Sequence, residues 1–182
     1  MHLFKKTGQE NTRQVFELVK RRCGELGIGT CLLATNTGQT AWVAREVLGD
    51  FSIVAVTHCT GYKEPNVQEL PETERAKLEE AGIRTLTAAH VFGTLGRAVR
   101  IKLGSYQLDE IMANTLRIFG QGTKVAVEIA LMAADAGLVR VGEPAVSVAG
   151  TGRGADTALV LLPANTHNFF DLKVREIICK PQ

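Results

Sequence analysis

The chain has 182 residues, of which 45% are hydrophobic and 22% are charged, a composition typical of one folded domain with a sizeable core. Its formal charge of +2 comes from scattered Lys and Arg residues and argues against a nucleic-acid partner. The sequence contains no run of about 18 apolar residues, the length needed to span a membrane. Its four cysteines form no C-x-x-C pair typical of a zinc site. We therefore expect a single cytoplasmic domain over residues 1–182, without a metal site.

Helix and strand patterns alternate along much of the chain, which predicts a mostly parallel sheet with helices on both faces. Periodicity predicts helices over residues 10–25, 40–48 and 72–80, and strands over 30–34, 51–57, 83–88, 145–149 and 157–162. Residues 91–139 break the alternation, and their long apolar faces predict a helical excursion from the sheet. The alternating segment 169–178 suits a strand at the edge of the sheet.

A hydroxyl-rich turn lies between the strand at 30–34 and the helix that follows it. This turn consists of Thr35, Asn36, Thr37, Gly38, Gln39 and Thr40. Backbone N–H groups at the start of a helix lack partners within the helix, and the helix dipole favours an anion there. The pattern therefore predicts a phosphate-binding loop, with an ordinary polar turn as the alternative.

A glycine-rich loop follows the strand at 145–149 and comprises Gly150, Thr151, Gly152, Arg153, Gly154, Ala155 and Asp156. Its glycine spacing is that of a dinucleotide fingerprint, but such a fingerprint needs a helix directly after the loop. A strand pattern follows here, so a Rossmann NAD site is not expected. Two interpretations stay open: a tight turn, or glycines that leave space for a planar or phosphorylated ligand beside Arg153.

The turn at residues 35–40 has the pattern T-x-T-G-x-T, which resembles the loop that holds the FMN phosphate in flavodoxins. A wider resemblance rests on three segments: Ala34–Ala41, Ile53–Thr57 and Val146–Gly152. Together they look like the C-terminal α/β domain of pyruvate kinase, and like small prokaryotic proteins built from that domain alone. The resemblance implies a phosphate pocket but no pyruvate kinase activity, because the catalytic barrel has no counterpart in this chain.

The family resemblance implies a three-layer α/β sandwich with strand order 3-2-1-4-5, the last strands being partly antiparallel. In such a sheet, ligands bind beyond the carboxyl ends of the strands where the strand order reverses. Residues 35–40 and 150–156 would meet there. Further candidate binding residues are Thr57, His58 and Gly61 after the second strand, and Gly120, Gln121, Gly122, Thr123 and Lys124 at the start of a helix.

We expect the ligand to be a phosphorylated cofactor, and FMN fits the T-x-T-G-x-T pattern and the glycine clearance best. Tyr62 and Phe92 are the candidates to contact its ring. The alternative is a non-catalytic sensor of a sugar phosphate or nucleotide, and a homo-oligomer stays open. No catalytic residue can be assigned, since Cys59 beside His58 fits either a nucleophile or an inert buried thiol.

Overall fold

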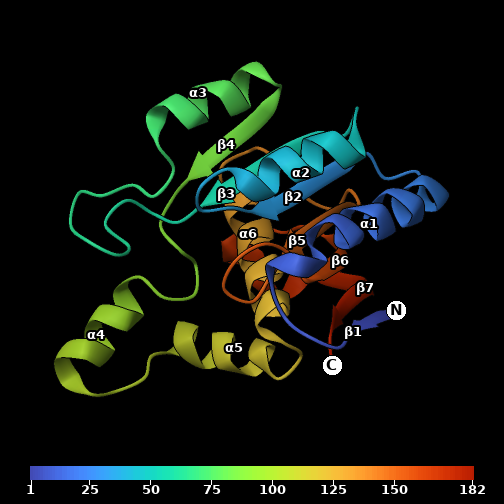
Figure 1. Cartoon of the computed structure of the whole chain (residues 1–182). Coiled ribbons are helices and arrows are strands. Elements are labelled where there is room, and N and C mark those ends of the chain that lie inside the picture. Colours follow the sequence, from blue (N-terminus) through green and yellow to red (C-terminus); the bar gives the residue numbers. More distant parts are fainter.

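A computed structural model describes residues 1–182 and contains one seven-stranded sheet between layers of helices (Figure 1). The strands are β1 (His2–Phe4), β2 (Thr30–Ala34), β3 (Ser52–Thr57), β4 (Ile83–Thr87), β5 (Ala145–Ala149), β6 (Thr157–Leu162) and β7 (Lys173–Pro181). The α-helices are α1 (Thr12–Leu26), α2 (Gln39–Leu48), α3 (Glu72–Glu80), α4 (Leu95–Leu103), α5 (Leu108–Arg117) and α6 (Gln121–Asp135). Two 3-10 helices, η1 (Gln9–Asn11) and η2 (Thr166–Asp171), complete the fold.

The strand order is β1-β7-β6-β5-β2-β3-β4, which differs from the expected five-strand order because β7 and β1 extend the sheet beyond β6. β5, β2, β3 and β4 run parallel, whereas β6 is antiparallel to both β5 and β7. The expectation that residues 169–178 form the edge strand is wrong, because β1 pairs along the outer side of β7. The edge on this side is therefore a strand of three residues, and short edge strands limit pairing with other chains.

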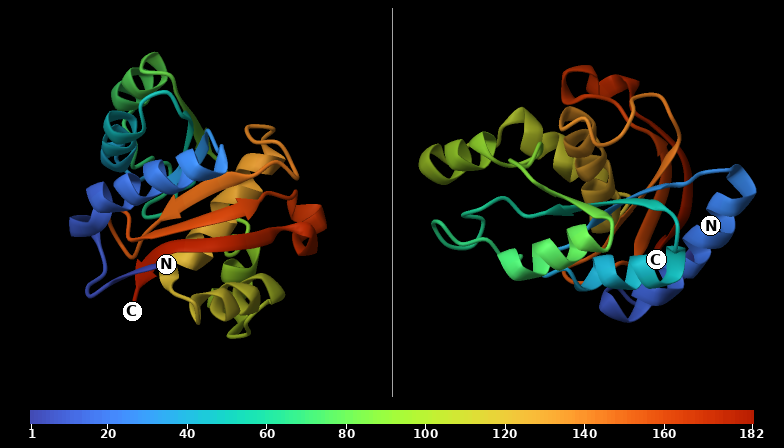
Figure 2. Two further views of the ribbon diagram at one scale, coloured as in Figure 1. Left: turned by 90° about the vertical axis from the view of Figure 1, so that its right-hand side faces the viewer. Right: turned by 90° about the horizontal axis from the view of Figure 1, so that it is seen from above.

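Two hydrophobic cores lie on opposite faces of the sheet. Helices α1, α2 and α3 cover one face, where Phe16, Ala44 and Leu78 are buried against strand residues (Figure 2). Helix α6 covers the other face, and every residue from Ala126 to Ala134 on it is buried. A helix that is apolar on nearly all sides is typical of such a central position.

The sequence pattern predicted that all of residues 91–139 form an excursion from the sheet. This prediction is wrong for α6, which is a layer of the sandwich. Only α4 and α5 leave the sheet, and Figure 1 shows them as an arm below it. Gly96 is the one buried residue of α4. No helix of the chain has the length and apolar character needed to cross a membrane.

Candidate functional site

A pocket of about 340 Å³ lies where β2 and β5 end side by side. We call it the loop pocket, because the turn after β2 and the glycine loop after β5 form two of its walls. Eleven of the predicted binding residues line it: Thr35, Asn36, Thr37, Gln39, Thr40, His58, Gln121, Gly150, Gly152, Arg153 and Gly154. Its volume is within the range of small-molecule sites in proteins, which begins at about 300 Å³.

The turn after β2 presents unpaired backbone donors to the loop pocket. The hydroxyl of Thr35 accepts a hydrogen bond from the Gly38 N–H at 3.1 Å, which fixes the turn, and Gly38 adopts a φ of 89°. The Thr35 N–H donates to the Val56 carbonyl at 2.9 Å. The four remaining amides of this turn donate no hydrogen bond within the chain; they belong to Asn36, Thr37, Gln39 and Thr40. Because α2 begins at Gln39, its dipole adds to the attraction of these amides for an anion.

The glycine loop supplies the opposite wall. The N–H groups of Gly150, Gly152, Arg153 and Gly154 likewise have no acceptor within the chain. Gly154 has a φ of 70°, and a Cβ there would lie 2.5 Å from the Cα of Gln9. A Cβ on Gly150 would lie 2.5 Å from the carbonyl oxygen of Gly154. These two glycines are therefore required by the close packing of the loop itself, whatever the ligand.

A third wall comes from the segment after β3 and contains a hydrogen-bonded His–Glu pair. The Nδ1 of His58 lies 2.6 Å from a carboxylate oxygen of Glu69, and Lys63 binds the other oxygen. Burial acts to raise the pKa of Glu69, but the hydrogen bonds from Lys63 and His58 outweigh it and lower this pKa. Tyr62 stacks on His58 with ring centroids 3.9 Å apart. The Nε2 of His58 is thus the ring nitrogen left for a ligand.

Three candidate residues near the turns lie outside the loop pocket because they serve the fold. Gly38 faces Glu74 and Leu78 of α3. Thr57 is buried, and its hydroxyl lies 2.7 Å from that of Thr87 on β4. Gly61 has a φ of 83° in the turn after β3.

Apart from Gln121, the candidates at the start of α6 also lie outside the loop pocket. Gly120 is the N-cap with a φ of 115°, and the Thr123 hydroxyl donates to the Phe119 carbonyl. A Cβ on Gly122 would lie 2.1 Å from the Thr157 hydroxyl, so this glycine lets α6 pack closely on β6. Lys124 is only 6% exposed and forms an ion pair with Glu128 one turn later.

Asp156 and Thr151 form a clamp inside the glycine loop and do not line the pocket. Asp156 is completely buried, and its Oδ2 accepts the N–H groups of Thr151 and Gly8, both at 3.0 Å. Its Oδ1 accepts the Thr157 hydroxyl at 2.8 Å. The carboxylate therefore holds the loop to the N-terminal segment of the chain.

Five residues of the pocket wall were not among the predicted binding residues: Gln9, Ala34, Lys63, Glu69 and Val125. Gln9 approaches from η1, far away in the sequence, and no local pattern marks it. Lys63 and Glu69 do follow a strand that ends at the pocket, so their position after β3 was a usable signal.

The four cysteines differ sharply in accessibility. Cys23, Cys31 and Cys179 are buried, and burial raises the pKa of Cys23 to about 11 and that of Cys179 to about 12. Cys59 alone is partly exposed.

With Ellman's reagent we expect one thiol to react in the folded protein and three to react only on unfolding. Cys59→Ser should abolish the fast phase, and a fast phase that survives this substitution would contradict the assignment.

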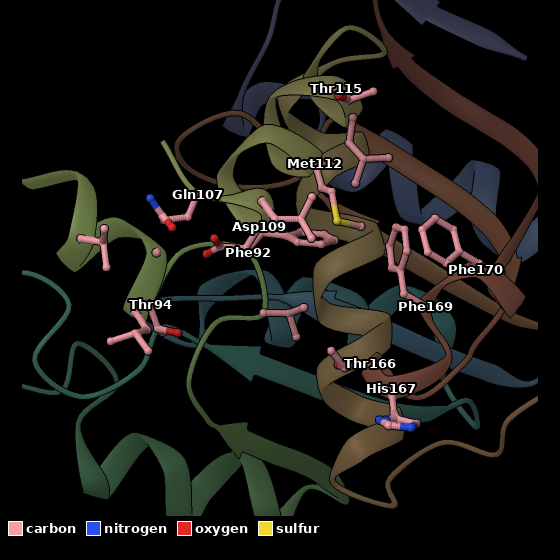
Figure 3. Close-up of a pocket in the computed structure, with 16 residues that line it drawn as sticks. Phe92, Thr94, Gln107, Asp109, Met112, Thr115, Thr166, His167, Phe169 and Phe170 are labelled. Carbon is pink, nitrogen blue, oxygen red and sulfur yellow. The ribbon is translucent and has the colours of Figure 1, made fainter. Parts of the chain in front are cut away.

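Another cavity, of about 950 Å³, lies elsewhere, between α4, α5 and η2 (Figure 3). Its walls are mainly apolar and include Phe92, Met112 and Phe169. Phe92 lines this cavity and does not line the loop pocket, which leaves Tyr62 as the aromatic residue at the candidate site.

Solved structures with similarity to this chain include two structures of pyruvate kinase from Cryptosporidium parvum. One, in complex with ADP, is 16% identical with a TM-score of 0.44 over 84% of this chain and 24% of that one. The second is 14% identical with the same TM-score, over 84% of this chain and 23% of that one. This chain thus spans about a quarter of their length. The sequence model of the family "Pyruvate kinase, alpha/beta domain" matches residues 13–161, so the chain belongs to the pyruvate kinase alpha/beta domain family.

Proposed function

We propose that the loop pocket binds a phosphorylated cofactor, FMN, with its phosphate between the turn after β2 and the glycine loop. The observation that carries the proposal is the set of eight amides without acceptors on the two facing loops, four on each. Such amides bind a phosphate monoester without a lysine, as at other helix N-termini. Arg153, which makes no ion pair within the chain, adds a positive charge at the same place.

The remaining walls suit the rest of the molecule. Tyr62 is 40% exposed and lies at the pocket with His58, so the two stacked rings offer a surface to a flavin ring. Glu69 orients His58, whose Nε2 can donate or accept a hydrogen bond at the ring edge. FMN would supply electron or hydride transfer, and these residues would bind and orient it.

The test is a titration of the purified protein with FMN, followed by quenching of flavin fluorescence, with riboflavin as the ligand that lacks the phosphate. We expect FMN to bind at least about 100-fold more tightly, since charge-assisted hydrogen bonds contribute about 1.5–3 kcal/mol each. Arg153→Gln should weaken FMN about 10-fold and leave riboflavin unchanged. Exposed Arg140 pairs with Glu143 elsewhere, so Arg140→Gln is the matched control.

Equal affinity for FMN and riboflavin would overturn the proposal. The second candidate function is a non-catalytic sensor of a sugar phosphate or nucleotide, which the same free amides favour because they recognise the phosphate alone. Thermal shifts with glucose 6-phosphate and AMP distinguish the two. A sensor would be stabilised by one of these ligands and not by FMN.

A further inference from the structure

A second polar pocket, of about 230 Å³, lies between α4, α5 and the start of α6. We call it the basic pocket, because four of its lining residues are cationic: Arg97, Arg100, Arg117 and Lys124. Glu110 is the one carboxylate among its lining residues, and it binds Arg100 at 2.8 Å. Lys124 is paired with Glu128, which leaves Arg97 and Arg117 with no carboxylate within ion-pair distance.

Neutral groups hold these two guanidinium groups in place. Arg117 donates to the side-chain oxygens of Gln121 at 2.8 Å and Asn114 at 2.7 Å. Arg97 lies over the ring of Tyr62, 5.6 Å from its centroid. Amide oxygens and an aromatic ring orient a guanidinium without neutralising its charge. The planar donor sets are therefore oriented and retain their full attraction for an oxyanion.

Lys124 contributes a buried charge to the same pocket. Its side chain is 8% exposed, and burial lowers its pKa although Glu128 acts in the opposite direction. Glu128 thus compensates only part of the cost of burying the Lys124 charge. A further negative charge nearby would stabilise the Lys124 ammonium group. His90, also at the pocket, has its pKa lowered by burial, and its Nε2 accepts the Cys59 N–H.

The basic pocket and the loop pocket are neighbours. Tyr62 lines both, and the Gln121 that orients Arg117 also lines the loop pocket. The ring of His90 lies 5.2 Å from that of Tyr62 and 5.4 Å from that of His58. The ring of Tyr62 would thus separate a small molecule in the basic pocket from a ligand in the loop pocket.

From this geometry we infer that the basic pocket binds the carboxylate or phosphate group of a second small molecule, held by Arg97 and Arg117 above Lys124. Two preoriented guanidinium groups match the oxygens of either group. The placement of this molecule beside a bound cofactor rests on the proposed function. The anion site itself does not, because its cations lie on α4, α5 and α6 and not on the turn after β2 or the glycine loop.

The experiment is a titration of 15N-labelled protein with inorganic phosphate and, separately, with acetate, at constant ionic strength. The side-chain Nε–H signals of Arg97 and Arg117 report on the basic pocket, and the amides of residues 36–40 report on the loop pocket. We expect saturable shifts of both arginine signals with at least one anion. Either Arg97→Gln or Arg117→Gln should weaken this binding about 10-fold, whereas Arg140→Gln should not.

Both substituted arginines are exposed, so the variants should keep the fold, and buried Lys124 is left unchanged. Non-saturating arginine shifts, or equal affinity in R97Q, R117Q and R140Q, would overturn the inference. Repeating the phosphate titration with FMN present separates the two proposals. If FMN fails to bind but the arginine signals still respond, only the proposed function falls. If FMN binds and the arginine signals do not respond to either anion, only the basic pocket falls.

Discussion

Lys124→Met is expected to lower the free energy of unfolding by about 3–5 kcal/mol, measured by urea denaturation. The substitution removes the partner of Glu128, which is 4% exposed and lies at the centre of the α6 layer. A carboxylate left alone in this position has lost its ion pair and cannot be solvated by water. The remaining hydrogen bond to Glu128, from the Phe92 N–H at 2.9 Å, is too little to compensate.

The double variant Lys124→Met/Glu128→Gln should recover most of this loss, because glutamine carries no charge and keeps an acceptor for the Phe92 N–H. Lys77 on α3 provides the control: it is 66% exposed and lies 3.7 Å from Glu74, so Lys77→Met should cost less than about 1 kcal/mol. A loss below about 1 kcal/mol in the Lys124→Met variant would contradict the expected cost of leaving the Glu128 carboxylate buried and unpaired.

Asp156→Ala should destabilise the protein by about 3 kcal/mol or more and weaken FMN binding as well. The buried carboxylate accepts hydrogen bonds from Gly8, Thr151 and Thr157, and alanine would leave these donors unpaired at about 1–3 kcal/mol each. The Thr151 amide anchors the start of the glycine loop, so its release should disorder the wall formed by residues 152–154. Urea denaturation and the FMN titration measure the two effects.

Asp171 in η2 is exposed, and Asp171→Ala should change stability by less than about 0.5 kcal/mol and leave FMN affinity unchanged. The loss of stability in Asp156→Asn should fall between those of Asp156→Ala and Asp171→Ala. Asparagine keeps one carbonyl oxygen as an acceptor, but its NH₂ group faces hydrogen-bond donors that the carboxylate had accepted. If Asp156→Ala lost FMN affinity with unaltered stability, Asp156 would be a ligand contact after all, as its place in the glycine loop had predicted.

Local chemistry explains which parts of the site could be predicted from the sequence. The turn of residues 35–40 needed only an apolar strand, a hydroxyl-rich turn and a helix start, and its Thr and Gln residues do line the loop pocket. By contrast, Asp156 and Lys124 are polar residues near the same loops that bind other parts of the protein. Residue type alone cannot tell whether a polar group is paired within the chain or with a ligand.

Glycines pose the same ambiguity. Gly122 and Gly150 are both required because a Cβ would collide with protein atoms, a reason that depends on contacts formed only in the folded chain.

The prediction of the strand order was limited for a similar reason, because it also depends on contacts between distant parts of the chain. The short β1 pairs with a strand from the other end of the chain, and three residues carry too little periodicity to predict a strand.

The exposed position of α4 has a consequence for any ligand of the basic pocket. With Gly96 as its one buried residue, this helix gains little from the hydrophobic core, so it is expected to open locally at a small fraction of the global unfolding energy. Arg97 is carried by α4, whereas Arg117 lies at the end of α5. An anion that joins them would fasten α4 to α5, and part of its binding energy would be spent on ordering α4. Substitutions on the outer side of α4 would then tune affinity without touching the ligand.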